Sequence, residues 1–487
     1  MADKLKVFFL SPEVVPFAKT GGLADVAGSL PAALKKLGVD VRVGLPYYRT
    51  VKEQRLSAQT ILPELEVPVG DSVLRGSVLE TETEDEIPVY FFEREDLFDR
   101  PNLYGTPQGD YYDNLERFTY FSHAALLFAK ETGFDFQVVH CHDWQTALVP
   151  AYVRTFYKTD PFFSRGVSVF TIHNIGYQGL FPKNKLAVTG LPTTEFNPAG
   201  IEYWDNLSLL KAGIVYADAI TTVSPRYSEE IQTSEYGMGM EGILQHRKAH
   251  LHGILNGVDY RVWDPVGDPH IPIQYSRKKM AGKARCKQSL MKEMNLDTSL
   301  KKRPVFGMIS RLSTQKGLDL LVKILDDILD LNIGLVVLGS GDKAIQQAIA
   351  EAAGRHPGRV GLTIGFDEPL AHRIMAGSDI LLIPSYYEPC GLTQMYALRY
   401  GTIPLVRATG GLDDTIVPFD RSTGEGNGFK FKAYKAEAFL GAVRQSVALF
   451  DDSKAWKRLI ANGMREDFSW DRSARSYLDL YQSVLQT

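Results

Sequence analysis

Several polar residues stand directly after short apolar runs, where a buried parallel strand would end. Lys19 and the pair Gly21-Gly22 follow the apolar run at residues 5–10 and precede a segment with helical apolar spacing. Two glycines let a ligand approach the backbone closely, and the N-terminus of a following helix attracts an anion. This loop predicts a phosphate or sugar site, although a tight turn with a solvated lysine fits the same residues. Asp25 would bind a ligand hydroxyl or stabilise the first helical turn.

A second loop of this kind carries two cations. Arg311 and Lys316 lie in the segment ISRLSTQKG, after an expected strand at residues 305–309 and before an expected helix. Two cations at the carboxyl end of a strand can neutralise a diphosphate and stabilise it as a leaving group. Two solvated loop charges account for the spacing equally well.

A third loop reads EPCGLT and follows an expected strand at residues 380–383. Glu388 is either a buried carboxylate that grips a sugar or acts in catalysis, or a solvated loop residue. Gly391, Leu392 and Thr393 would open the next helix and form another anion-binding terminus. Cys390 is expected to be an inert small residue rather than a nucleophile, because no histidine adjoins it in the sequence.

Polar and aromatic residues also gather after two strands of the first half. The segment HCHDW contains Asp143, but its histidines and cysteine are too close together to share one tetrahedral zinc ion, so no metal is expected. His173-Asn174 ends an expected strand at residues 167–172, where the pair would grip a sugar hydroxyl or satisfy the core.

Four aromatic residues are candidates for stacking on sugar rings. Tyr104, Tyr111 and Tyr112 belong to a segment rich in proline, glycine and tyrosine that is expected to be a long surface loop, and Trp144 belongs to HCHDW. Packing within the protein explains any one of them equally well.

The elements that must position these residues follow one repeated order. A strand at residues 5–10, a helix at 23–37 and a strand at 39–45 form a βαβ unit, and the pattern between residues 56 and 92 suggests additional hairpin strands. From residue 304 onward the alternation is strict, which predicts a parallel, doubly wound sheet. The expected strands are 305–309, 335–338, 360–364, 380–383 and 404–406, and the expected helices are 317–331, 343–353, 369–376 and 393–400.

This pattern predicts an α/β protein with two Rossmann-like domains joined near residue 255. Two such domains would face a cleft, and open parallel sheets bind ligands beyond the carboxyl ends of their strands. The last segment, residues 472–485, has a helical pattern with no strand after it.

Composition excludes several classes of protein. The 487 residues include 54 Lys and Arg and 58 Asp and Glu, a formal charge of −4 that does not favour binding to nucleic acid or a membrane surface. The three cysteines, with no C-x-x-C pair, fit a reducing compartment and argue against a zinc ribbon. With no long apolar run, a cytoplasmic location is expected.

Motifs of other enzyme classes are missing or weak. The sequence has no D-x-D, no P-loop, no H-E-x-x-H and no G-x-S-x-G. Gly339-Ser340-Gly341 with Ala344 fits G-x-G-x-x-A after a strand, which by itself weakly suggests a dinucleotide site.

Longer motifs carry a family resemblance. Seven motifs follow one another along nearly the whole chain. They are KTGGLADVAGSLP, HCHDW, FTIHNIGYQG, TTVSP, GILNGVD, SRLSTQKG and EPCGLTQMYALRYG. With them the sequence closely resembles bacterial glycogen synthases and plant starch synthases. The resemblance implies a GT-B fold, in which two Rossmann-like doubly wound domains face a central cleft. The implied domains are residues 1–255 and 256–467, with a C-terminal helix at 468–487 that packs back on the first domain.

The implied reaction is the transfer of glucose from a nucleotide sugar, usually ADP-glucose, to the non-reducing end of an α-1,4-glucan such as glycogen. The anomeric configuration is retained, and neither a metal nor another cofactor is required. The leaving phosphate would help to deprotonate the attacking hydroxyl, so that no strong enzyme base is needed. The implied partners are therefore ADP-glucose and the glucan, with no nucleic acid and no membrane, while the formation of a homo-oligomer stays open.

The resemblance also implies roles for individual residues. Those assigned to catalysis are Glu388, His173, Lys316, Arg311 and Asp143. Those assigned to the donor are Lys19, Gly21, Gly22, Asp25, Asn174, Asn256, Cys390, Gly391, Leu392 and Thr393, and those assigned to the acceptor are Tyr111, Tyr112 and Trp144. One departure is visible: many retaining enzymes of this fold have Glu-x7-Glu, and Tyr396 stands where the second Glu, a ribose ligand, would be.

The sequence leaves four alternatives to this function. They are a synthase that prefers UDP-glucose, a glucan phosphorylase that uses pyridoxal phosphate, a dehydrogenase that uses the Gly339-Ser340-Gly341 loop, and an inactive glucan-binding protein. The presence of Lys19, Arg311, Lys316 and Glu388 argues against the last.

Overall fold

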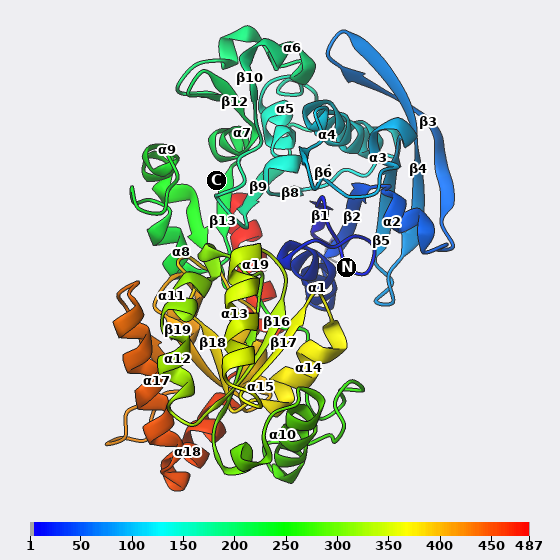
Figure 1. Ribbon diagram of the computed structural model, residues 1–487. Helices are drawn as coiled ribbons and strands as arrows, with labels where there is room; N and C mark the ends of the chain where they lie inside the picture. Colours follow the sequence, from blue (N-terminus) through cyan, green and yellow to red (C-terminus); the bar gives the residue numbers. More distant parts are fainter. Residues whose placement is uncertain (1–3, 487) are drawn as a thin grey trace. The chain divides into compact units, whose positions relative to one another are not determined.

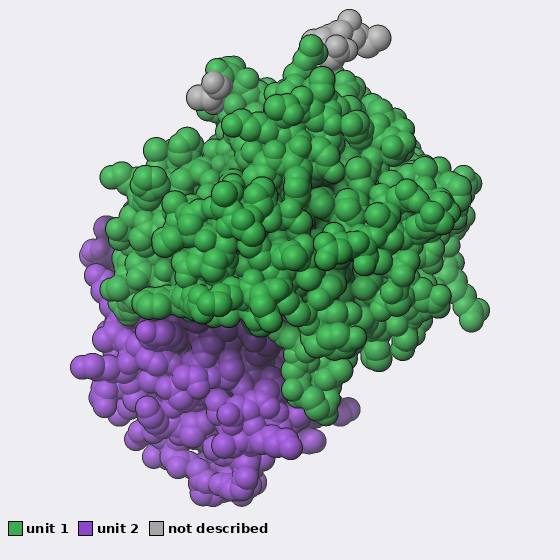
Figure 2. All heavy atoms as spheres, turned by 90° about the horizontal axis from the view of Figure 1, so that it is seen from above, with its two compact units in different colours: residues 1–257, 470–487 green, residues 258–469 purple. Residues whose placement is uncertain are grey.

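The computed structural model describes residues 4–486, and the chain divides into two compact units. Unit 1 comprises residues 1–257 and 470–487, and unit 2 comprises residues 258–469 (Figures 1 and 2). These divisions lie two residues beyond the expected boundaries at 255 and 467. No helix within residues 4–486 is both long and apolar enough to cross a membrane.

The sheet of unit 1 has nine strands in the order β14-β13-β9-β8-β1-β2-β5-β4-β3. Its pairs are parallel except at one edge, where the long hairpin of β3 and β4 pairs antiparallel with β5 (Figure 1). This hairpin confirms the β additions expected between residues 56 and 92. The strands are β1 (Lys6–Leu10), β2 (Asp40–Pro46), β3 (Gln59–Val69), β4 (Ser72–Glu82), β5 (Pro88–Glu93), β8 (Val138–His142), β9 (Val167–Ile172), β13 (Ala219–Thr222) and β14 (Leu251–Gly253).

The strand order of unit 1 reverses beside β1. The chain passes from β1 to β2 on one side, whereas β8, which comes later, pairs with β1 on the other side. The loops that leave β1 and β8 therefore diverge, as they do at the ligand sites of open parallel sheets. The helices are α1 (Gly22–Lys36), α2 (Arg49–Glu53), α3 (Glu95–Phe98), α4 (Asn114–Glu131), α5 (Leu148–Arg154), α6 (Leu186–Thr189), α7 (Leu209–Tyr216), α8 (Pro225–Glu230), α9 (Glu241–His246) and α19 (Trp470–Val484).

The C-terminal helix α19 belongs to unit 1. It packs against α1, and the hydroxyl of Tyr481 forms a hydrogen bond of 2.7 Å with Nδ1 of buried His140 on β8. The hydroxyl of Ser473 donates another, of 2.6 Å, to the carbonyl oxygen of Leu255. Helix α19 is thus hydrogen-bonded to the rest of unit 1.

The sheet of unit 2 has six parallel strands in the order β17-β16-β15-β18-β19-β20. The predicted alternation of strands and helices is confirmed. The strands are β15 (Val305–Ile309), β16 (Gly334–Gly339), β17 (Val360–Ile364), β18 (Ile380–Ile383), β19 (Ile403–Arg407) and β20 (Phe429–Phe431). The helices are α10 (Ala281–Glu293), α11 (Leu318–Lys323), α12 (Leu325–Leu329), α13 (Lys343–Arg355), α14 (Glu368–Gly377), α15 (Thr393–Arg399), α16 (Gly410–Thr415), α17 (Ala436–Phe450) and α18 (Ser453–Gly463).

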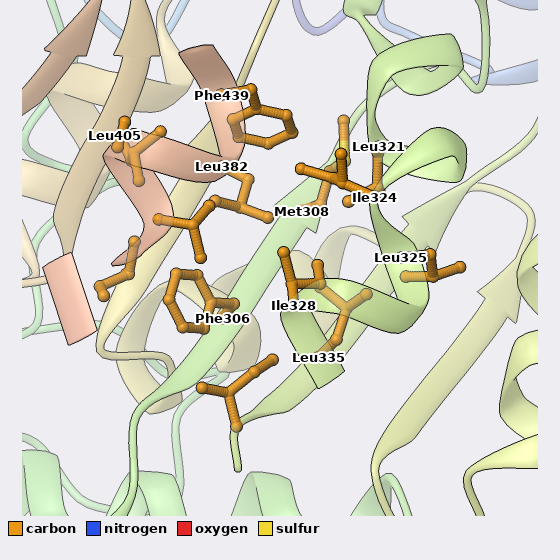
Figure 3. Close-up of a cluster of buried hydrophobic side chains, with 14 of the residues drawn as sticks. Phe306, Met308, Leu321, Ile324, Leu325, Ile328, Leu335, Leu382, Leu405 and Phe439 are labelled. Atoms are coloured by element: carbon orange, nitrogen blue, oxygen red, sulfur yellow. The ribbon is translucent and has the colours of Figure 1, made fainter. Parts of the chain in front are cut away.

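A large apolar cluster lies on one face of this sheet. Figure 3 shows side chains of strands β15, β16, β18 and β19 packed against those of α11, α12 and α17. Each fully buried side chain of this kind contributes about 1.5–3 kcal/mol to folding. The labelled members are Phe306, Met308, Leu321, Ile324, Leu325, Ile328, Leu335, Leu382, Leu405 and Phe439.

Two local expectations need correction. The helix expected at residues 317–331 is two short helices, α11 and α12, because the backbone at Ile324 leaves the helical region with φ −113° and ψ 12°. The break lets the apolar residues of both halves reach the same core. The segment at residues 99–113 is not wholly a surface loop, because Leu103 is buried and the short strands β6 (Gly105–Thr106) and β7 (Gly109–Asp110) form a hairpin.

A buried polar network ties the start of unit 2 to its sheet. Both the ring of His372 and the hydroxyl of Tyr400 contact Oδ2 of Asp268, at 2.8 and 2.6 Å. The ring of Trp263 lies between those of His372 and Tyr396, with centroids 3.8 and 4.2 Å away. Burial by itself would raise the pKa of Asp268, but the hydrogen bonds from His372 and Tyr400 outweigh it and leave the pKa below its ordinary value.

We predict that this network stabilises unit 2 only while Asp268 is ionised. Its pKa is lower in the folded protein than in the unfolded chain, so the stabilisation is complete above about pH 4 and is lost as the pH falls further. At pH 7 Asp268→Asn should lower the free energy of unfolding by about 1.5–3 kcal/mol, as expected for hydrogen bonds to a charged group. Urea unfolding at pH 7, 5, 4 and 3 measures the difference, which should shrink at the lowest pH.

Asp330→Asn is the matched control, because Asp330 is exposed in the same unit. A deficit of Asp268→Asn that is the same at pH 7 and pH 3 would show that the charge of Asp268 is not what stabilises the network.

Candidate functional site

The strand order of unit 2 reverses between β15 and β18. Strands β16 and β17 extend the sheet on one side, and β19 and β20 extend it on the other. The loops after β15 and β18 carry Lys316 and Glu388. Nζ of Lys316 lies 2.8 and 2.6 Å from the two carboxylate oxygens of Glu388, and the two side chains are only 19% and 11% exposed. The structure thus joins two predicted site residues at the switch point of the sheet.

A hydrogen bond to Glu388 and a close approach of the two loops hold the Lys316–Glu388 pair in place. The hydroxyl of Ser385 donates a hydrogen bond of 2.8 Å to Oε2 of Glu388. Gly317 has φ +75°, and a Cβ there would stand 2.1 Å from the carbonyl oxygen of Pro384. Only glycine lets the loop of Lys316 approach the loop of Glu388 this closely.

Arg311 lies at the same sheet edge but is exposed. Its guanidinium donates to the neutral side-chain oxygen of Gln315 at 2.9 Å. Lys316 and Glu388 neutralise one another, whereas the hydrogen bond to Gln315 leaves the charge of Arg311 uncompensated. Arg311 is therefore the cation at this edge that is best placed to meet a phosphate-bearing ligand.

The backbone of the EPCGLT loop is held by buried groups. Gly391 has φ +68°, and the side-chain amide of Gln394 donates to the carbonyl oxygens of Cys390 and Gly391 at 3.1 and 2.9 Å. Gly410 and Gly411 pack on the other side, where a Cβ on either would stand 2.0 Å from a carbonyl oxygen of the loop. Sequence reasoning missed Gln394 and this glycine pair, and the G-G in ATGGLDD was the available signal.

The Gly339-Ser340-Gly341 loop has a packing role. The backbone N–H of Leu312 donates to the carbonyl oxygen of Ser340, and a Cβ at Gly339 would lie 1.9 Å from the carbonyl oxygen of Ser310. The glycine lets the loops after β15 and β16 touch, which accounts for the motif without a dinucleotide.

Phe366 is a further residue that sequence reasoning missed. It follows β17 at the carboxyl edge of the sheet, and its ring is 83% exposed. A large aromatic ring left in water at the same sheet edge as Arg311 offers a stacking face. Its position directly after an expected strand, in TIGFDE, was the available signal.

In unit 1 the Lys19 loop is organised by a residue that sequence reasoning missed. The carboxylate of buried Glu13 accepts hydrogen bonds from the backbone N–H groups of Thr20 and Gly21 and from the hydroxyls of Thr20 and Tyr104. The N–H groups of Thr20 and Gly21 are therefore already engaged, whereas the anion site expected at the N-terminus of the following helix, which begins at Gly22, stays a prediction.

The other members of the loop lie where the sequence suggested. Nζ of Lys19 forms an exposed ion pair of 2.8 Å with Asp25, in the first turn of α1. Gly22 begins that helix and Gly21 caps it, and a Cβ at Gly21 would meet nothing within 4 Å.

Asp143 and His173 meet at the ends of the neighbouring strands β8 and β9. Oδ1 of Asp143 accepts a hydrogen bond of 2.8 Å from the backbone N–H of His173, and the backbone of Asp143 is strained, with φ +56°. Burial raises the pKa of Asp143 to about 7 and lowers that of His173 to about 3. The ring of His173 is therefore neutral at physiological pH.

Two candidate amides lie on the same edge of the unit 1 sheet. Oδ1 of Asn174 accepts from the N–H of Gly176, which forms a local turn. Asn256 follows β14 and is buried, and its Oδ1 has no hydrogen-bond partner within residues 4–486. Asn256 thus keeps an unused acceptor.

The aromatic candidates differ in their surroundings. The hydroxyl of Tyr104 donates to Glu13, and the other three differ in exposure. Tyr112 is 86% exposed, whereas Trp144 is buried and packs edge-on against Phe118 with ring centroids 5.0 Å apart. Tyr111 lies under the guanidinium groups of Arg100 and Arg117, 4.8 and 5.0 Å from its ring centroid. Of the three, Tyr112 has the freely exposed ring.

Within residues 4–486 no group of three or more His, Cys, Asp or Glu side chains is arranged to hold a metal ion. The HCHDW segment instead contributes hydrogen bonds: its two histidines contact Thr171, Tyr481 and His173.

Known proteins resemble both units. Residues 6–246 match the family described as the starch synthase catalytic domain, and residues 293–465 match glycosyl transferases group 1. The chain is 45% identical over 483 residues to the glycogen synthase of Syntrophotalea carbinolica, and 45% identical over 482 residues to that of Koribacter versatilis, with 99% of each chain covered in both cases.

Solved structures of glycosyltransferases resemble the chain as well. The catalytic domain of starch synthase IV from Arabidopsis thaliana, bound to ADP and acarbose, superposes with a TM-score of 0.92 at 33% identity and 100% coverage of both chains. Sucrose-phosphate synthase from Thermosynechococcus elongatus, with a TM-score of 0.61 at 17% identity over 99% of this chain and 100% of its own, shares the fold. The α/β class with two Rossmann-like units is thereby confirmed, and the chain belongs to the glycogen and starch synthase family of glycosyltransferases.

Proposed function

We propose that the chain is a retaining glucosyltransferase that elongates the α-1,4-glucan of glycogen with glucose from ADP-glucose. The observation that carries this proposal is the Lys316–Glu388 pair at the switch point of unit 2, in a chain 45% identical to glycogen synthases over its whole length. The glucose transfer needs no metal at this site, because protein cations stabilise the leaving diphosphate. The free, buried cysteines suit the reducing cytoplasm, where we place the reaction.

The residues of unit 2 are proposed to bind the diphosphate end of the donor. Arg311 supplies a positive charge, and Lys316 contacts the diphosphate while Glu388 grips a glucose hydroxyl. The backbone of residues 390–393 donates hydrogen bonds to the phosphate. Phe366 is proposed to stack on the base, since every nucleobase presents a flat π-face to an exposed ring.

The residues of unit 1 are proposed to serve the glucose and the glucan. Lys19 contacts the donor phosphate from the loop that Glu13 holds. Asp143 orients the backbone of His173, and Asn174 and Asn256 offer amide groups to the sugar hydroxyls. The exposed ring of Tyr112 stacks on the acceptor chain, and Tyr111 and Trp144, although packed against other side chains, are proposed to belong to the acceptor side as well.

The proposed chemical step balances without an added base. The bond between the anomeric carbon of glucose and the phosphate oxygen breaks as a bond to the acceptor 4-oxygen forms on the same face. The proton of the attacking hydroxyl passes to the departing phosphate. Arg311 and Lys316 stabilise the negative charge that develops on the diphosphate.

The activity is tested by incorporation of labelled glucose into glycogen, with ADP-glucose and UDP-glucose compared in the presence of EDTA. We expect strong transfer from ADP-glucose with EDTA present. A preference for UDP-glucose would overturn the proposed donor, and a requirement for a divalent cation would overturn metal-free catalysis. Failure to transfer from either sugar, with an absorbance band of pyridoxal phosphate, would favour a phosphorylase.

The role of the buried ion pair is tested by removing its charges singly and together. Lys316→Gln and Glu388→Gln should each reduce kcat at least about 100-fold, because a preorganised charge at the reacting group is lost. Each should also destabilise the protein, because the other charge is left buried and unpaired. The double variant should regain most of the stability but none of the activity.

Lys343→Gln is the control, since Lys343 is exposed at the start of α13, after a neighbouring strand of the same sheet. If the double variant regained activity together with stability, the pair would be structural and its catalytic role would be refuted.

The stacking role of Phe366 is tested by steady-state kinetics. Phe366→Ala should raise KM for ADP-glucose about tenfold or more with kcat little changed, because stacking on a base contributes about 1–3 kcal/mol to binding. Phe366→Tyr should behave like the wild type. Ile364→Ala, at an exposed apolar position of the same strand end, is the control. Equal KM values for Phe366→Ala and the wild type would rule out stacking.

A further inference from the structure

A row of buried histidines ends at His173. His140 and His142 alternate along β8 and so point to the same face of the sheet, with ring centroids 4.1 Å apart. Phe9 of β1 contacts both rings, at centroid distances of 5.1 and 4.2 Å. Nδ1 of His142 lies 2.9 Å from Nε2 of His173. His173 is thus held through its ring as well as through the backbone N–H bound by Asp143.

The two linked rings are neutral. Burial lowers the pKa of His142 well below its ordinary value, and burial lowers that of His173 to about 3. A neutral imidazole has one N–H and one lone pair, so in the contact one ring donates and the other accepts. The direction of this hydrogen bond sets which nitrogen of His173 carries the proton.

The second nitrogen of His142 decides the direction. Its Nε2 is buried, and no group within residues 4–486 forms a hydrogen bond with it. If His173 donated, His142 would carry its proton on Nε2 and bury an N–H that has no acceptor, at a cost of about 1–3 kcal/mol. If His142 donates from Nδ1, only a lone pair is left without a partner. Buried N–H groups without acceptors are the rarer defect in folded proteins.

The neighbouring His140 provides a contrast. Its Nδ1 lies 2.7 Å from the hydroxyl of Tyr481, and its Nε2 lies 2.6 Å from Oγ1 of Thr171. Both of its nitrogens are therefore engaged within the protein. His140 has a structural role, and His142 is the histidine that acts on the candidate site.

We infer that His142 is a positioning residue that fixes the tautomer of His173, with the proton on Nδ1 and the lone pair of Nε2 occupied by the N–H of His142. This assignment depends only on the protein. Its consequence rests on the proposed function: His173 would offer a sugar oxygen an N–H donor from Nδ1, and its Nε2 would be unavailable as a base.

The tautomer is measured directly in the wild-type protein. Long-range proton–nitrogen NMR correlations of protein labelled with ¹⁵N-histidine distinguish a protonated ring nitrogen from an unprotonated one. The signals of His173 are identified by their loss in His173→Gln. We expect Nδ1 of His173 to be protonated and Nε2 to be unprotonated. A proton on Nε2 would overturn the inference, whatever reaction the protein catalyses.

A matched pair of variants tests the causal role of His142. An Asn amide can place an N–H where Nδ1 of histidine stood, whereas an Asp carboxylate of the same shape can only accept once it is ionised, so the two variants are compared at alkaline pH. His142→Asn should keep the proton of His173 on Nδ1, and His142→Asp should move it to Nε2. With ADP-glucose and glycogen as substrates, kcat of the Asp variant should be about 10- to 100-fold below that of the Asn variant, as for other residues that orient a functional group.

His140→Asn is the control: it should lower stability without changing the tautomer of His173. The same tautomer and the same kcat in the Asn and Asp variants would overturn the positioning role. If the Asp variant does not fold, the wild-type spectrum and the Asn variant still decide the assignment. If no nucleotide sugar is a substrate, the proposed function fails while the tautomer assignment is still judged by the spectrum.

Discussion

The reversal of strand order within each parallel sheet is the constraint on which the rest of the structure depends. All parallel strands of a sheet end at one edge, and only where the order reverses do adjacent loops diverge. In unit 2 this point lies between β15 and β18, and it joins Lys316 to Glu388 across 72 residues of sequence. In unit 1, Asp143 and His173 leave neighbouring strands beside the same kind of point.

Burial then gives the two groups of residues different electrostatic characters. At the edge of unit 2, Lys316 and Glu388 neutralise one another and Arg311 retains its charge. In unit 1, burial keeps the ring of His173 neutral and raises the pKa of Asp143 to about 7. The charge of Arg311 suits the diphosphate of a nucleotide sugar, and hydrogen-bonding residues with a neutral imidazole suit the sugar itself. The proposed division of labour follows from this difference.

Several residues hold the loops of the candidate site in place through hydrogen bonds to other protein groups. Glu13 binds the backbone of the Lys19 loop, Gln394 binds the carbonyl oxygens of the EPCGLT loop, and Ser385 binds Glu388. Catalytic groups need support of this kind, because a small displacement from the productive geometry costs a large part of the rate. His142 does the same for the proton of His173.

The sequence by itself determined the class of fold, the order of its strands and helices, and the loops of the candidate site. Apolar runs and helical spacing are local properties, and the motifs are contiguous, so Lys316, Glu388 and His173 could be named directly. The break at Ile324 was not predicted, because a continuous helical pattern does not reveal how two short helices share one core.

Only the tertiary structure decided which side chains meet and which are buried. It placed Trp144 in the core and left Phe366 in water, although both are aromatic residues near the ends of strands. It engaged the N–H groups of the Lys19 loop with Glu13 and joined the rings of His142 and His173. Hydrogen-bond partners and pKa values depend on distances between groups far apart in the chain, and these distances exist only once the strands have paired.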